Sequence, residues 1–126
     1  MNLPVGRAQT RDQLIQDCAQ ALADAFADYN AEFRAVTARA RQRFEARDWR
    51  GSQRDAVERI GLYSKYVDGA VEIMHHMLGE DVHERAIWSS IKRRFAEIID
   101  PLPDNEVPKT FFCSITRQTF LTVGVD

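Results

Sequence analysis

An uninterrupted helical pattern near the N-terminus constrains the fold of this chain more than any other feature. Between Thr10 and Arg47 there is no glycine or proline and alanine is abundant, which favours one continuous helix. The apolar residues recur at steps of three and four, the period of a single helix face: Leu14, Ile15, Cys18, Leu22, Phe26, Tyr29, Phe33, Val36, Ala40 and Phe44. We predict a helix over residues 11–47, about 50 Å long. It needs a long partner, and Cys18 on its stripe is expected to be a small buried apolar residue.

A second helix is predicted over residues 49–78. Asp48 can accept hydrogen bonds from its first turn, and Gly79 can adopt the left-handed conformation that ends many helices. The same three-four spacing is present in Trp49, Gln53, Ala56, Ile60, Tyr63, Val67, Ala70, Met74 and Met77. The short connection predicts an antiparallel hairpin, in which Phe33 and Ile60 are buried between the two helices. Trp49 and Trp88 are interpreted as core residues.

Two shorter helices are predicted to follow. Asp81 and Glu84 resemble a capping box, and Pro101 disfavours a helical residue before it, so we expect a helix over residues 82–99. Apolar spacing then favours a short helix over residues 109–119, although its threonine and aromatic content also suits a strand. The prediction is therefore an all-α fold: a long antiparallel hairpin plus one medium and one short helix.

Composition and charge fit one domain and exclude several classes. The chain has 126 residues, 44% of them apolar, with no run long enough to span a membrane and no secretory signal, so we expect a cytoplasmic protein. Residues 34–59 carry eight arginines against four acids, a local charge of +4, whereas the whole chain carries −2. Such a region can meet nucleic acid or an acidic protein surface. We favour a solvated helical face and no nucleic-acid partner, because no aromatic residues are interleaved for base stacking.

Residues that could carry chemistry are sparse. Glu72 with His75, and Glu80 with His83, show the Glu-x-x-His spacing of di-iron bundles. The second pair spans the predicted turn and no further glutamate ligands stand out, so no metal site is predicted. The sequence contains no phosphate-binding glycine loop, His-Arg-Asp catalytic loop, Asp-Phe-Gly triplet or Gly-x-Ser-x-Gly elbow. We therefore assign no catalytic, cofactor-binding or metal-binding residue.

Several segments resemble one known family. The most specific are residues 111–117 (FFCSITR) and 122–126 (TVGVD), preceded in the same order by 41–45 (RQRFE), 48–49 (DW) and 59–63 (RIGLY). They are similar to the N-terminal regulatory domain of the isocitrate dehydrogenase kinase/phosphatases, over about residues 14–126. Cys113 stands where that pattern has asparagine, and Gln118-Thr119 where it has a basic and then an aliphatic residue.

The resemblance implies a helical regulatory domain that precedes a protein-kinase-like domain. In that family the second domain binds ATP with Mg²⁺ and phosphorylates and dephosphorylates isocitrate dehydrogenase on serine, which controls the glyoxylate bypass. The family also has ATPase activity, and AMP is its allosteric effector, bound between the domains. None of the family's catalytic or ATP-binding positions falls within residues 1–126. The implied partners are the kinase-like domain and isocitrate dehydrogenase.

The C-terminal segment supports reading the chain as a fragment. Its last eighteen residues contain seven large apolar side chains: Phe111, Phe112, Ile115, Phe120, Leu121, Val123 and Val125. Because terminal residues are rarely tied down, we expect some of them to be exposed here and covered by a domain absent from this chain. The fragment alone should be inactive. The alternative is a free-standing helical interaction module that binds a partner through its apolar stripe or its arginine-rich face.

Overall fold

The fold is a long helical hairpin crossed by two shorter helices. A computed structural model describes residues 10–99 and 106–124, with α1 (Arg11–Glu45), α2 (Trp49–Leu78), the 3₁₀ turn η1 (Gly79–His83), α3 (Arg85–Ile99) and α4 (Glu106–Gly124). No strand occurs in these two ranges, so the all-α prediction is confirmed. The predicted loop at Pro101 and Pro103, residues 125–126, and the side chains of Leu121 and Val123 lie outside what the structure describes.

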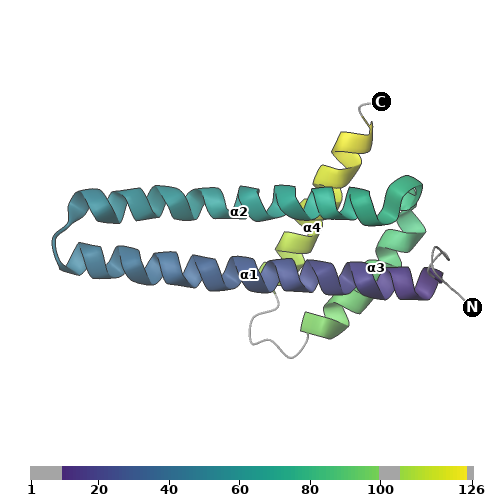
Figure 1. Cartoon of the computed structure of the whole chain (residues 1–126), viewed down its shortest axis with the longest axis horizontal. Helices are drawn as coiled ribbons and strands as arrows, with labels where there is room; N and C mark the ends of the chain where they lie inside the picture. Colours follow the sequence, from purple (N-terminus) through teal and green to yellow (C-terminus); the bar gives the residue numbers. More distant parts are fainter. Residues whose placement is uncertain (1–9, 100–105, 125–126) are drawn as a thin grey trace, which may run out of the picture.

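Local capping sets the ends of the hairpin. Thr10 begins α1, since its hydroxyl accepts a hydrogen bond from the Gln13 N–H at 3.1 Å. The helix ends two residues before the predicted 47, because Arg47 adopts a left-handed conformation with φ of 63°. Asp48 then caps α2 as predicted, accepting from the Gly51 N–H at 3.0 Å. The two helices run antiparallel along their whole length (Figure 1).

The prediction for the start of the third helix is wrong by three residues. Gly79 has a φ of 55°, and residues 79–83 form η1 instead of a helical first turn. The Asp81 carbonyl accepts the Glu84 N–H at 3.0 Å, and α3 begins at Arg85. The turn redirects the chain so that α3 and α4 lie on the same face of the hairpin and cross it obliquely (Figure 1).

The core lies where α3 and α4 cross the hairpin. Helix α4 is longer than the predicted 109–119, and its Phe111, Phe112 and Ile115 are buried in the chain's own core. The Phe111 ring stacks on Tyr29 at a centroid distance of 5.8 Å. For Phe111, Phe112 and Ile115, the expectation of exposure is therefore wrong, whereas Phe120 is only partly buried. The expectation for Leu121, Val123 and Val125 falls outside the described side chains. Cys18 and Trp88 are buried as predicted.

The prediction of which side of α2 packs against α1 is wrong for the first half of α2. Ile60 is 75% exposed and Trp49 is 56% exposed, whereas Phe33 on α1 does pack against the core. The position between the helices at this level belongs to Asp55, which is 3% exposed. Its carboxylate pairs with Arg39 at 3.0 Å and with Arg43 at 3.4 Å. A buried carboxylate paired with two partly exposed arginines thus lies in the part of the hairpin where the spacing predicted apolar contacts.

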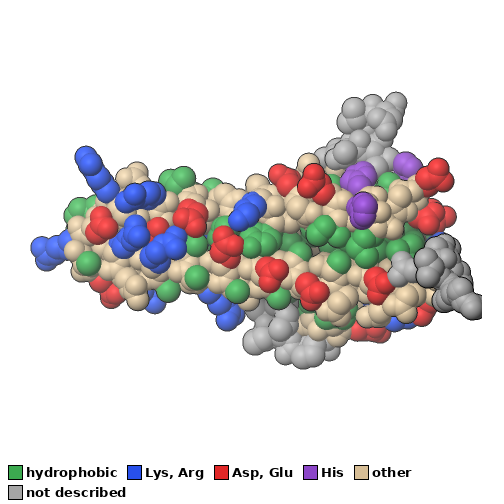
Figure 2. Space-filling view, viewed as in Figure 1, with side chains coloured by type: hydrophobic (Ala, Val, Ile, Leu, Met, Phe, Trp, Pro, Cys, Tyr) green, Lys and Arg blue, Asp and Glu red, His purple; other side chains and the backbone are tan. Residues whose placement is uncertain are grey.

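Charge is unevenly distributed along the hairpin. Figure 2 shows most of the visible blue Lys and Arg side chains at the end where α1 and α2 connect, with red acidic side chains both among them and along the remainder of this face. In the part of the chain that the structure describes, no helix is both long and apolar enough to cross a membrane.

Candidate functional site

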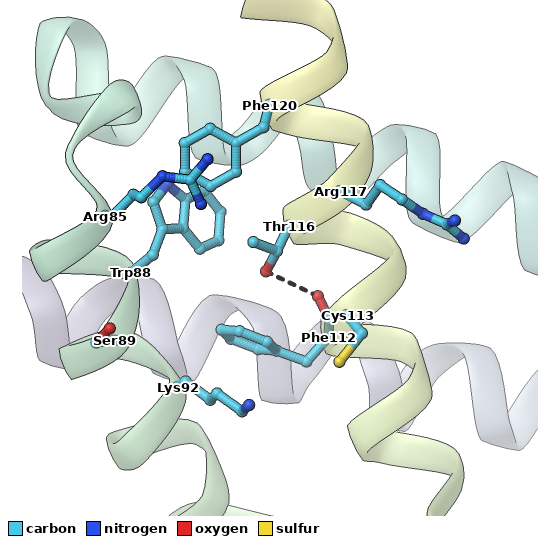
Figure 3. A pocket seen from close by; sticks show the side chains of 9 residues that line it. All are labelled: Arg85, Trp88, Ser89, Lys92, Phe112, Cys113, Thr116, Arg117 and Phe120. Atoms are coloured by element: carbon cyan, nitrogen blue, oxygen red, sulfur yellow. Dashed lines mark hydrogen bonds between the residues drawn. The ribbon is translucent and has the colours of Figure 1, made fainter.

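A cleft lies between α3 and α4. Figure 3 shows its lining, which comes from one face of each helix. The volume of the cleft is about 610 Å³. Helix α3 contributes Arg85, Trp88, Ser89 and Lys92, and helix α4 contributes Phe112, Cys113, Thr116, Arg117 and Phe120.

Helical periodicity explains why these residues meet. Arg85, Ser89 and Lys92 are spaced by four and three residues, so they share one face of α3. Phe112, Thr116 and Phe120 are spaced by four along α4 in the same way. The crossing of the two helices then brings the two faces together.

The floor of the cleft is aromatic and held in place. The Trp88 indole N–H donates to the Val82 carbonyl at 2.9 Å, which ties α3 to the preceding 3₁₀ turn. The Trp88 and Phe112 rings lie edge to face at 6.1 Å, and Phe112 also packs on Phe95 at 5.1 Å. Because Trp88 and Phe112 are both buried, the floor is fixed by the core.

The rim of the cleft is cationic. Arg85, Lys92 and Arg117 line it, and the lining contains no Asp or Glu. The Arg85 guanidinium lies 4.8 Å from the centre of the Phe120 ring, a cation–π contact. Arg117 extends away from the aromatic floor towards α2 (Figure 3), where it also lines a smaller hollow beside Tyr63.

This arrangement suits binding of a ligand that is both anionic and planar. Arginine and lysine attract carboxylate or phosphate groups. Among the aromatic rings of the lining, Phe120 is the one that is not buried, so a flat group would meet Phe120 beside Arg85. The only hydroxyls on the lining are those of Ser89 and Thr116, and Thr116 donates to the Phe112 carbonyl at 3.0 Å. The lining contains no carboxylate or histidine that could act as a general acid or base. Of the side-chain types that serve in proton transfer, the lining contains Lys92 and Cys113.

The sequence analysis assigned no site residue and so missed this cleft. The spacing of Arg85, Ser89 and Lys92 was a usable signal for a polar face on α3, but nothing in the sequence indicated which face of α4 would lie opposite. The Glu-x-x-His residues lie elsewhere: Glu72 and His75 are on α2, and Glu80 and His83 are in η1. Among residues 10–99 and 106–124, no group of three His, Cys, Asp or Glu side chains is placed to hold a metal ion.

Comparison with known proteins identifies the family. Residues 19–126 match the model of the regulatory domain of isocitrate dehydrogenase kinase/phosphatase (AceK). The chain belongs to this family. The match includes α2, α3 and α4 complete, so the cleft and the hairpin connection both lie inside the regulatory-domain segment.

Similarity to individual proteins supports the same family. Proteins named isocitrate dehydrogenase kinase/phosphatase are 45% identical over 107 residues in Xanthomonas campestris pv. campestris (strain 8004) and 42% identical over 116 residues in Anaeromyxobacter dehalogenans (strain 2CP-C). A third, from Methylibium petroleiphilum, is 37% identical over 102 residues. These matches cover 85%, 92% and 81% of this chain, but only 18%, 20% and 16% of the relatives. The chain therefore spans about a fifth of the length of these curated relatives.

Proposed function

We propose that this chain is a non-catalytic regulatory segment of a cytoplasmic, bifunctional kinase/phosphatase that phosphorylates and dephosphorylates isocitrate dehydrogenase. The match of residues 19–126 to the family's regulatory domain carries the proposal. The absence of kinase motifs from the 126-residue sequence supports a regulatory role for this segment rather than a catalytic one. Its partners are then a kinase-like domain, with ATP and Mg²⁺ bound there, and isocitrate dehydrogenase as the protein substrate.

Phosphate transfer tests the non-catalytic part of this proposal. The isolated chain, incubated with isocitrate dehydrogenase, Mg²⁺ and ATP labelled on its γ-phosphate, should leave isocitrate dehydrogenase unlabelled, because the groups that position Mg²⁺ and the γ-phosphate are missing. The full-length Xanthomonas relative serves as the positive control. Stoichiometric labelling by the isolated chain would overturn the proposal.

We further propose that the cleft between α3 and α4 forms one wall of the site for the effector AMP. AMP combines a phosphate with a planar base, and the cleft combines a cationic rim with an aromatic floor. In the longer relatives, segments outside the matched region would complete such a site. Binding of AMP to this chain alone should therefore be weak.

The two tryptophans make weak binding measurable. Trp88 lines the cleft, whereas Trp49 lies at the connection between α1 and α2, so each indole N–H in an NMR spectrum reports a different region. AMP should shift the Trp88 signal and leave Trp49 unchanged, and adenosine, which lacks the phosphate, should act far more weakly. The double variant Arg85→Gln/Lys92→Gln should abolish the AMP shift, while Arg93→Gln should preserve it. An AMP shift that persists in the double variant would refute this assignment.

A further inference from the structure

Exposed apolar residues are concentrated at one end of the hairpin. Among the described residues, four large apolar side chains are more than half exposed, and all four lie there: Phe44 at 60%, Trp49 at 56%, Val57 at 65% and Ile60 at 75%. We call these four the tip patch. The rings of Phe44 and Trp49 pack edge to face at 5.0 Å, so the patch has an ordered aromatic part. Such a concentration on a charged helical surface is typical of an interaction site.

The tip patch continues a face of α2 that is used for helix packing elsewhere. Starting from Val57 and Ile60, steps of four and three residues lead along α2 to buried side chains: Val67, Val71, Met74 and Leu78. Helix α4 crosses only the second half of α2 (Figure 1). Tyr63 lies where α4 meets α2, and its hydroxyl forms a hydrogen bond with the Ser114 hydroxyl at 2.6 Å. One stripe is therefore covered by a helix in one half and uncovered in the other.

Most arginines around the tip patch form no ion pair with another described residue. Arg39 and Arg43 hold the buried Asp55, and Arg39 also pairs with Glu58 at 2.9 Å. Five others make no ion pair or ring contact with any residue that the structure describes: Arg34, Arg41, Arg47, Arg50 and Arg54.

Most acidic side chains of this region already cap a helix or form an ion pair within the chain. Asp48 caps α2, Asp55 is buried, and Glu58 is paired, so Glu45 is the one acid here with none of these roles among the described residues. Arginines therefore outnumber acids on this surface, although acidic side chains also lie among them on the side visible in Figure 2. Arg50 and Arg54 lie one turn apart, seven and three residues before Val57, and border the apolar stripe.

We infer that the tip patch is a docking site for an acidic amphipathic helix. The apolar stripe accepts the apolar face of such a helix in the way α4 is accepted further along α2, and the unpaired arginines match its acidic flanks. Tryptophan and arginine are also the residues that most often dominate binding at interfaces. The tip extends beyond α3 and α4, which leaves space for a second molecule (Figure 1).

Other occupants fit the same surface less well. A second copy packed tip to tip in a symmetric pair would bring like charges together. Nucleic acid would engage the arginines and could stack on Phe44 and Trp49, but it would leave the aliphatic Val57 and Ile60 without a partner. An acidic helix uses both the arginines and the apolar stripe.

Binding of a designed peptide to the full chain tests the inference. The probe is a fluorescein-labelled peptide of roughly 15 residues, about four helical turns, with leucine at three-four spacing and glutamate beside it. Fluorescence anisotropy should show saturable binding, and the peptide should shift the NMR indole signal of Trp49 but not that of Trp88. A peptide of the same composition with its leucines scrambled off one face should bind at least about ten-fold more weakly.

Matched variants locate the binding surface. Val57→Ser/Ile60→Ser and Arg50→Gln/Arg54→Gln should each weaken binding about ten-fold, and the arginine variant should also reduce the dependence of binding on salt. The controls Ile73→Ser and Arg93→Gln remove the same residue types elsewhere and should bind like the parent. All the substituted side chains are exposed, so circular dichroism should show unchanged helix content.

Three outcomes would overturn the inference. The first is equal binding of the ordered and scrambled peptides, or of the tip variants and the parent. The second is a parent that sediments as a dimer and becomes monomeric in Val57→Ser/Ile60→Ser, since a second copy would then cover the patch. The third is a single-stranded oligonucleotide that binds the parent more tightly than the ordered peptide does and loses this affinity in Arg50→Gln/Arg54→Gln.

Discussion

At the scale of single residues, Gly51 is more constrained than its helical position suggests. A Cβ added at Gly51 would collide with the Asp48 carboxylate and come within 2.8 Å of the Arg43 Cδ. Displacing Asp48 breaks the cap that it makes with the Gly51 N–H. The same Cβ at Gly61 meets nothing within 4 Å.

We predict opposite effects of alanine at these two glycines. Gly61→Ala should stabilise the chain by up to about 1 kcal/mol, because alanine favours the helix. Gly51→Ala should destabilise it by about 1 kcal/mol, because the lost cap outweighs that gain. Urea unfolding of both variants, compared with the parent, measures the difference. Equal stabilisation by both substitutions would show that Asp48 can move without cost.

The two cysteines should differ sharply in reactivity. Burial, with a smaller contribution from Asp17, raises the pKa of the Cys18 thiol from 9.0 to about 11, whereas Cys113 is exposed. Because the thiolate is the reactive form, iodoacetamide at pH 8 should modify Cys113 alone in the folded chain and both cysteines in guanidinium. Mass spectrometry of peptides from a time course distinguishes the two. Above pH 9, ionisation of Cys18 should favour unfolding, since the unfolded chain then binds fewer protons than the folded one.

At the scale of helices, the sequence predicts the bounds of the hairpin better than it predicts which helix faces are buried. The absence of glycine and proline before Arg47, and the cap at Asp48, were enough to define the hairpin. The facing of α2 was not predictable, because two of its faces carry apolar residues: one meets α1, and the other, which includes Ile60, meets α4 only in the second half. The cleft could not be predicted from the sequence either, because it depends on the angle at which α3 and α4 cross. The 3₁₀ turn that delays α3 to Arg85 had no clear sequence signal.

Helix α4 should be essential for the stability of this chain. Phe111 is fully buried and its ring lies 5.5 Å from that of Phe26. Phe111→Ala should cost about 3–5 kcal/mol, whereas Phe44→Ala, at an exposed position, should cost well under 1 kcal/mol. A chain ending near Pro108 should accordingly lose far more helix signal than α4 itself contributes. Thermal unfolding monitored by circular dichroism tests the two variants and the shortened chain. Unchanged melting of the shortened chain would mean that α4 is not part of the core.

At the scale of the whole molecule, the hairpin should have two regions of different stability. The half crossed by α3 and α4 contains nearly all the buried apolar side chains, while the tip half is held mainly by Val36, Leu62 and the Asp55 ion pairs. Regions with few buried apolar contacts open at lower free energy than the core. We therefore predict that amides of residues 38–58 exchange with deuterium much faster than those of residues 18–29 and 67–78, although all are helical apart from the connection. Mass spectrometry with residue-level fragmentation measures this directly. Binding of the acidic peptide should slow exchange at the tip and leave the core unchanged, whereas uniform exchange along both helices would mean that the hairpin opens as one unit.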